Sequence, residues 1–206
     1  MTENSQGLVD IGRLILTFAK VNRTTLHEDG VTPESDTDHT VMISVCACAL
    51  AEKLYKESLD VGLVAQFAIV HDLVEAYAMD TDTFGISESE RNEKSVREHK
   101  AFLRIQDEFK SVYPWLPSMI EKYELLDTKE ARFVKTVDKL MHKITHILNT
   151  GAYFKKRGMD EETMWNKYQT LVRTTEEKYG AEFPEILELL DELIREAKRI
   201  AYARNT

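Results

Sequence analysis

The chain has 206 residues, of which 43% are hydrophobic and 31% are charged, a composition typical of a globular protein. A chain of this length buries one substantial core, as a single domain or as a domain with a helical extension. Its formal net charge of -9 argues against a dedicated nucleic-acid surface, because binding to a phosphate backbone requires clustered Lys and Arg.

No targeting segment is recognisable in the sequence. Residues 1–8 are polar and acidic, unlike the start of a secretory signal. The longest apolar run, Val41–Ala51, is too short to cross a bilayer. We therefore expect a cytoplasmic protein with no membrane partner and no nucleic-acid partner.

Helical periodicity dominates the chain, and alternating strand patterns are nearly absent. The sequence predicts, in chain order, helices over Leu8–Val21, His39–Lys56, Asp60–Ala78, Ser87–Tyr113, Leu116–Leu126, Lys129–Asn149, Glu161–Tyr179 and Pro184–Ala203. Asp60 can cap its helix, Ser87 with Glu90 fits a capping box, and Pro184 suits a first helical turn. The predicted fold class is all-α, a helical bundle.

Three stretches do not fit a helix: Asn22–Asp38, Asp80–Ile86 and Lys155–Asp160. Long polar loops beside a rigid scaffold tend to carry binding groups. The first two flank the helix at Asp60–Ala78 in sequence, so we expect them to form the rim of a site. Cys46 and Cys48 are two residues apart on a predicted helix, which indicates reduced core cysteines rather than a disulfide.

The most informative segment is the helix predicted over Asp60–Ala78, which has apolar residues on almost every side. Such a helix is normally central and buried. At about 100° per residue, His71, Asp72 and Glu75 fall on one face of it. An imidazole and two carboxylates are costly in a buried helix unless something compensates them, and a bound cation is the most economical explanation.

Four side chains from three helices can be assembled into a ligand set: His39, His71, Asp72 and Asp138. Asp138 borders the apolar stripe of its own helix, so it should point partly inward. Two imidazoles and two carboxylates suit one divalent transition metal ion, Zn²⁺, Co²⁺ or Mn²⁺, with Mg²⁺ as an alternative, and leave positions open for water or substrate.

Each of these residues also has a simpler interpretation. A His-Asp dipeptide arises by chance, His39 can be an ordinary first-turn residue, and Asp138 can pair with Lys135 or Lys139 at the surface. Two further histidines, His142 and His146, are open to both interpretations, as extra ligands or as hydrogen-bonded or solvated groups. His99, between Glu98 and Lys100, indicates a solvated helix face.

The order and spacing of the four ligands resemble the HD superfamily of metal-dependent phosphohydrolases. The pattern is similar to the branch of YfbR-like 5'-deoxynucleotidases and phage dATP triphosphohydrolases. That branch has an Arg, a polar loop ending in an acidic residue and His, then H-D-x-x-E-x-x-x-x-D, then a late Asp. The corresponding residues here are Arg23, Asp38-His39, His71-Asp72 with Glu75 and Asp80, and Asp138. The resemblance covers about residues 8–150.

The resemblance implies an HD-domain core over residues 1–150, with the helices of residues 151–206 packed on the same domain as a C-terminal extension. It also implies a nucleotide as a small-molecule substrate. Catalytic roles fall to Glu75, which would orient or deprotonate a water, and Asp80, which would protonate the departing 5'-oxygen. Substrate contacts fall to Arg23, as a phosphate clamp, and to Thr83.

Two departures from that branch affect the expected substrate. The chain has Thr24 where the deoxynucleotidases typically have Trp near the sugar, and it lacks their Lys after the acidic residue that follows the helix. Other phosphate contacts are therefore expected from Lys94 or Arg97, which the sequence does not rank.

The predicted function is a phosphohydrolase of deoxynucleotides, leaning to a triphosphohydrolase that releases deoxynucleoside and triphosphate. A 5'-deoxynucleotidase acting on monophosphates and a non-catalytic nucleotide-binding HD module are the alternatives. A homo-oligomer is also left open, because an apolar stripe on the helix Glu161–Tyr179 suits either internal packing or assembly.

Overall fold

The structure, a computed structural model, describes residues 1–81 and 87–203. Its elements are α1 (Glu3–Phe18), β1 (Asn22–Leu26), β2 (Pro33–Ser35), α2 (Asp36–Leu54), α3 (Val61–Val70), α4 (Glu75–Ala78), α5 (Glu88–Phe109), α6 (Trp115–Leu125), α7 (Lys129–Leu148), α8 (Ala152–Lys156), α9 (Glu161–Tyr179) and α10 (Pro184–Ala201). The prediction of a predominantly helical chain is confirmed.

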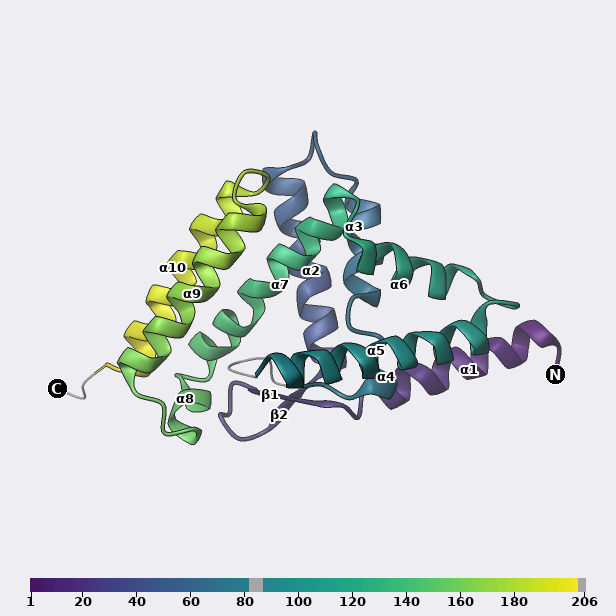
Figure 1. The fold of residues 1–206 in the computed structure, drawn as a ribbon, viewed down its shortest axis with the longest axis horizontal. Helices are drawn as coiled ribbons and strands as arrows, with labels where there is room; N and C mark the ends of the chain where they lie inside the picture. Colours follow the sequence, from purple (N-terminus) through teal and green to yellow (C-terminus); the bar gives the residue numbers. More distant parts are fainter. Residues whose placement is uncertain (82–86, 204–206) are drawn as a thin grey trace.

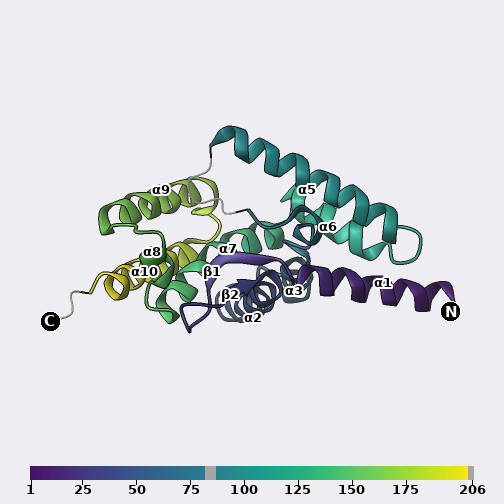
Figure 2. The same cartoon turned by 90° about the horizontal axis from the view of Figure 1, so that it is seen from below.

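The helices are arranged around α7 and α2, which lie together in the middle of the molecule (Figure 1). Helices α8, α9 and α10 lie on one side of this centre, and α1, α5 and α6 lie on the other (Figures 1 and 2). Helix α7 packs against α2, α3 and α10, so it contributes to the core along most of its length. The two termini lie at opposite ends of the molecule.

The predicted helix starts have the local causes expected from the sequence. Asp60 accepts hydrogen bonds from the backbone N–H groups of Gly62 and Leu63, Ser87 and Glu90 form a capping box, and Pro184 is the first residue of α10. Helix α1 begins earlier than expected, at Glu3, because Thr2 caps it. Both cysteines of α2 are free and half-buried.

An aromatic cluster joins the two halves of the core. Tyr55, Phe133 and Phe183 come from the end of α2, from α7 and from the residue before α10. Their ring centroids lie 5.3 to 5.6 Å apart in edge-to-face arrangements, the geometry that aromatic pairs prefer. The Tyr55 hydroxyl also donates to Glu185, and these contacts anchor α10 on the central pair of helices.

The stretch Asn22–Asp38 contains a hairpin that the sequence did not predict. Strands β1 and β2 pair antiparallel, with Asn22 opposite Ser35 and Leu26 opposite Pro33. The strands have only five and three residues, too few for a clear alternating pattern. Ser35 then caps α2 through a capping box with Asp38, so this helix starts three residues before the expected His39.

The helix expected over Asp60–Ala78 is broken, which corrects the sequence-based boundary. Helix α3 ends at Val70, residues 71–74 form tight turns, and α4 follows. The backbone N–H of Leu73 bonds to Val70 and that of Glu75 bonds to Asp72, a spacing of three residues instead of four. The imidazole of His71 lies 2.9 Å from the carbonyl oxygen of Ala68, an oxygen that a continuing α-helix would use for its own hydrogen bond.

The segment Val61–Ala78 is also long and apolar enough to cross a membrane, with a mean hydropathy of 1.3. However, 56% of it is buried inside the fold, as is usual for the core helix of a globular protein, so its composition is weak grounds for a membrane span.

The C-terminal helices pack on the rest of the chain. Helix α10 runs along α7, and α9 contacts both α10 and α7. Part of the stretch after Gly151 is helical, because α8 forms at Ala152–Lys156, which the sequence did not predict. On α9 the predicted apolar stripe packs inward, with Tyr168 fully buried and Trp165 partly buried against the core.

Candidate metal centre

Three of the four predicted ligands meet in one cluster. His39 lies in the first turn of α2, and His71 and Asp72 lie in the tight turn after α3. One ligand atom from each of the three lies within 4.8 Å of the other two. The tight turn therefore brings His71 and Asp72 to the start of α2, where His39 is held by the capped helix end.

The fourth predicted ligand, Asp138 of α7, lies at the edge of this cluster. Its Oδ1 is 3.1 Å from Nε2 of His39, and its Oδ2 accepts a hydrogen bond from Lys139 at 2.8 Å. Asp138 is outside the set in which every ligand atom lies within 4.8 Å. It does not have the surface position of the simpler interpretation, since its side chain is only 16% exposed.

The hydrogen bonding of His71 leaves one nitrogen facing the cluster. Its Nδ1 lies 2.9 Å from the carbonyl oxygen of Ala68, which makes Nδ1 the protonated nitrogen and leaves a lone pair on Nε2. This Nε2 is buried and lies 3.1 Å from Oδ2 of Asp72 without hydrogen-bond geometry. A backbone carbonyl that orients an imidazole in this way is typical of metal-binding histidines.

The spacing of the donor atoms suits a shared ion. Bonds of about 2.1 Å at angles of about 90–130° would place two ligand atoms about 3.0–3.8 Å apart. The observed separations are 3.1 Å for His71 and Asp72, 3.1 Å for His39 and Asp138, and 3.8 Å for His39 and Asp72. The donor set of imidazole nitrogens and carboxylate oxygens therefore fits a divalent ion.

Arg23 connects the hairpin to this cluster. One guanidinium nitrogen lies 3.1 Å from both Asp36 and Asp72, and the other terminal nitrogen lies 3.1 Å from Nε2 of His142. The Arg23 side chain is only 8% exposed. Burial opposes the charge on Asp72, but His71 and Arg23 hold the pKa of Asp72 well below its usual range, so this carboxylate is ionised.

Asp36 is a site residue that the sequence did not single out. Its side chain is fully buried, and one of its oxygens has no hydrogen-bond partner in the part of the chain that the structure describes. Burial raises its pKa to about 7, although Arg23 opposes this shift. In the sequence Asp36 is one of five acidic residues in the polar loop Asn22–Asp38, and only the capping pattern Ser35-x-x-Asp38 would have placed it in a helix.

Glu75 is buried beside the cluster, and Lys94 of α5 covers it. Lys94 donates to Oε1 of Glu75 at 2.9 Å, whereas Oε2 of Glu75 is buried and has no hydrogen-bond partner within residues 1–81 and 87–203. Burial, followed by the charge of Asp72, raises the pKa of Glu75 to about 10. The two neighbouring carboxylates are thus held in opposite protonation states, which is how acid–base pairs are commonly divided.

The structure gives fewer contacts for the other predicted site residues. Burial raises the pKa of Asp80, and the cations that oppose this shift, Arg23 and Lys94, put Asp80 near the cluster. Arg97 donates to the hydroxyl of Thr81 instead of contacting Glu75, so Lys94 is the cation nearer to the cluster. Thr83 lies outside the described residues.

The structure distinguishes the roles of the three further histidines that the sequence singles out, His99, His142 and His146. His99 is exposed on α5, as the solvated interpretation predicts. His146 is buried and bonds through Nδ1 to the Tyr168 hydroxyl at 2.7 Å, so it is a hydrogen-bonded core residue. His142 contacts Arg23, and its ring centroid lies 6.0 Å from that of His39, which makes it a neighbour of the cluster.

The sequence matches the HD domain family over residues 18–179, more than half of the chain. The chain therefore belongs to the HD domain family. The matched region extends beyond the residues 8–150 of the sequence-based resemblance at its C-terminal end and includes α9. No curated protein matches the chain significantly.

Solved structures with the same fold come from a bacterium and from archaea. A predicted metal-dependent phosphohydrolase from Magnetospirillum magnetotacticum MS-1 is 25% identical, with a TM-score of 0.71, and the match covers 96% of this chain and 98% of that one. A conserved hypothetical protein from Pyrococcus furiosus is 26% identical, with a TM-score of 0.61 and coverage of 91% and 99%. A Pyrococcus horikoshii OT3 protein at 22% identity and a TM-score of 0.61, with coverage of 90% and 99%, shares the fold.

Proposed function

We propose that this protein is a metal-dependent phosphohydrolase that acts on deoxynucleotides and prefers triphosphates, releasing deoxynucleoside and triphosphate. The observation that carries the proposal is the cluster of His39, His71 and Asp72, whose donor atoms lie within 4.8 Å of one another. The similar bacterial protein described as a predicted metal-dependent phosphohydrolase supports the reaction class. The sequence pattern that ends at Asp138 supports the choice of nucleotide.

In this proposal His39, His71, Asp72 and Asp138 would hold one divalent ion. When bound, such an ion activates water near neutral pH and polarises a phosphoryl oxygen. The chain's own residues supply the remaining functions. Nδ1 of His71 is tied to the backbone, so this imidazole is kept in the orientation that a ligand needs.

Glu75 and Asp80 would move the protons. Glu75 has one oxygen bonded to Lys94 and one buried oxygen with no partner among the described residues, which leaves a carboxyl oxygen available for proton transfer. Asp80 follows α4 and is half-buried near Arg23 and Lys94. Of the two, Asp80 is the group that we assign to protonate the leaving 5'-oxygen.

Arg23 would both position the metal-binding carboxylate of Asp72 and bind the phosphate of the substrate. Its hydrogen bond to Asp72 positions that carboxylate, and its Nε is buried without a hydrogen-bond partner among the described residues. A guanidinium in this position can offer a further donor to a phosphate oxygen. Thr24, next to Arg23, is smaller than the Trp of the deoxynucleotidases, so we expect a preference for deoxyribose that is weaker than in those enzymes.

One assay tests the proposal. The purified protein is incubated with each dNTP and each dNMP, and with ATP and AMP, in separate reactions with Mg²⁺, Mn²⁺, Co²⁺ and Zn²⁺. Release of triphosphate from a dNTP supports the proposal, and release of orthophosphate from dNMPs alone would assign the protein as a 5'-deoxynucleotidase. If no nucleotide is hydrolysed with any of these ions, the proposed enzymatic function is wrong.

A further inference from the structure

Lys143 of α7 is a buried lysine that has no hydrogen-bond or ion-pair partner among the described residues. The residue is only 3% exposed. Within residues 1–81 and 87–203 it makes no hydrogen bond and no ion pair, and its ammonium lies 4.7 Å from the centre of the Tyr168 ring on α9. An isolated buried ammonium is costly, so a lysine in this setting calls for an explanation.

Among the described residues, the two charged groups that affect the pKa of Lys143 do not neutralise it. One is Lys139, a like charge one helical turn earlier, and the other is Asp138. Both oxygens of Asp138 are already engaged, one with His39 and the other with Lys139. Burial, with Lys139 as the second cause, lowers the pKa of Lys143 to about 7.

The surroundings of Lys143 favour an anion over a metal ion. His142 and His146, its neighbours on α7, are held neutral, because burial and the charge of Lys143 lower the pKa of each. From α9, the Tyr168 ring faces the ammonium, and its hydroxyl is bonded to His146. No carboxylate from the described residues contacts Lys143, so a bound anion would supply the missing charge.

Lys143 is placed one turn beyond the metal centre. It follows Lys139 by four residues on α7, which puts it about 6 Å further along the helix axis. Lys139 itself is bonded to the predicted ligand Asp138. Along α7, Lys143 is therefore the next lysine beyond Lys139 from the metal cluster.

We infer that Lys143 binds a phosphate group of the substrate other than the one that is attacked at the metal centre. This inference rests on the proposed function and adds a residue that selects for a phosphate chain over a single phosphate. A monophosphate held at the cluster ends before Lys143, whereas the outer phosphates of a triphosphate can reach it. The ammonium would then gain a charge-assisted contact that the free protein lacks.

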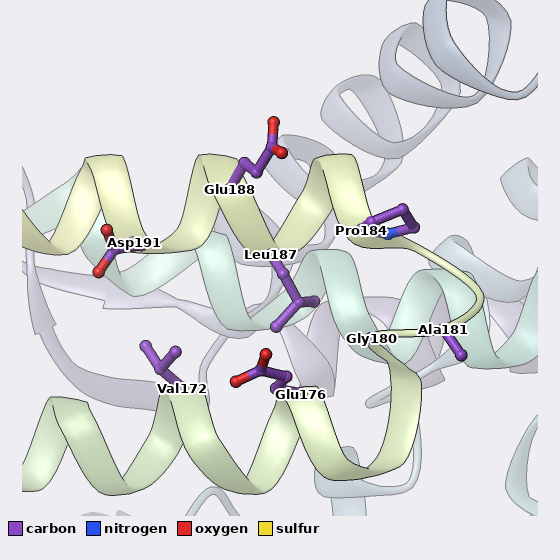
Figure 3. Close-up of a pocket in the computed structure, with 8 residues that line it drawn as sticks. All are labelled: Val172, Glu176, Gly180, Ala181, Pro184, Leu187, Glu188 and Asp191. Atoms are coloured by element: carbon purple, nitrogen blue, oxygen red, sulfur yellow. The ribbon is translucent and has the colours of Figure 1, made fainter.

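The groove between α9 and α10 lacks the chemistry to bind a phosphate chain. The groove between α9 and α10 is lined in part by Glu176, Glu188 and Asp191, and Figure 3 shows Val172 and Leu187 pointing into the space between the two helices. Carboxylates repel phosphate, and none of the lining residues belongs to the metal centre.

The test compares a chain of phosphates with a single phosphate. Tripolyphosphate and orthophosphate are titrated separately into the full-length protein in excess Mg²⁺, and binding is measured by calorimetry. The variants are Lys143→Met, which keeps the volume and removes the charge, and Lys143→Gln, which keeps a polar end and guards against a packing defect. Lys156→Met on α8 is the matched control, because Lys156 is exposed.

We expect both Lys143 variants to bind tripolyphosphate about 10- to 100-fold more weakly than wild type and Lys156→Met, the loss usual for a contact to a charged group. Orthophosphate affinity should change by less than about threefold. Equal tripolyphosphate affinity in wild type and both Lys143 variants would overturn the inference, as would an equal loss for orthophosphate. The titration needs no turnover, so a protein that hydrolyses no nucleotide would refute the proposed function without deciding the role of Lys143.

Discussion

A metal ion should stabilise this protein, and a single histidine substitution should remove most of that effect. The donor atoms of His39, His71 and Asp72 are already within 4.8 Å of one another in the folded chain. In the sequence His39 lies 32 positions before His71, so the unfolded chain does not hold the three donors together and the ion binds the folded state preferentially. Preferential binding raises the free energy of unfolding by mass action.

The size of the effect follows from the ion concentration. At one hundred times its dissociation constant, an ion that binds only the folded state adds about 2.7 kcal/mol to the free energy of unfolding. For a domain of this length, each kcal/mol raises Tm by about 2–4 °C. Metal-stripped protein should therefore gain about 5–11 °C in Tm on addition of Mn²⁺ or Co²⁺.

His71→Gln should abolish most of this gain, because it removes the Nε2 lone pair that faces the cluster. His99→Gln is the matched control, because it makes the same chemical change at an exposed position of α5, away from the cluster. Differential scanning calorimetry with and without the ion gives the shift, and elemental analysis gives the number of ions bound. If His71→Gln keeps the full shift and one bound ion, the assignment of His71 as a ligand is wrong.

Three further predictions follow from the same contacts. Glu75→Ala should leave the metal-induced rise in Tm largely intact and lower kcat by about two to four orders of magnitude, as for the loss of a positioned acid or base; full activity would exclude Glu75 from the mechanism. Arg23→Ala should raise KM more for dATP than for dAMP, because it removes a cation next to Asp72; unchanged KM and kcat for both substrates would exclude a phosphate clamp. Lys143→Met should change the pH dependence of stability. The pKa of Lys143 is lowered from 10.5 to about 7 in the folded state, so the unfolded chain binds more protons between these values and stability rises with pH across this window. Denaturant titrations of wild type and Lys143→Met at pH 7 and pH 10 should show a smaller rise for the variant, and an equal rise would show that folding does not lower the pKa of Lys143.

The parts of the fold that depend on local chemistry could be predicted from the sequence. The helix starts at Asp60, Ser87 and Pro184 are set by side chains within a few residues, and they are found where expected. The break after Val70 could not be predicted, because Phe67, Val70 and Val74 are buried on either side of it and the apolar pattern continues through it. The hairpin was missed for a similar reason, since three residues are too few to display a period.

The sequence predicts a site residue only where that residue differs in polarity from its neighbours in the chain. The His71-Asp72 pair stood out because charged and polar groups are costly in an apolar segment. Asp36 did not stand out, because in the sequence it is one acidic residue among several in a polar loop. Its burial depends on the hairpin that brings Arg23 to it, and that is a tertiary contact.

The burial of Lys143 also depends on a tertiary contact that the sequence does not reveal. In the sequence, Lys135, Lys139 and Lys143 recur every four residues and read as the solvated face of a helix. The structure places α9 against α7 instead, and the Tyr168 ring covers the ammonium of Lys143. One face of α7 therefore presents Asp138 and its neighbours to the start of α2, and the adjoining face presents a buried cation to α9. The family match ends with α9, at the last residue of that helix, which is consistent with α9 being part of the unit that forms the site.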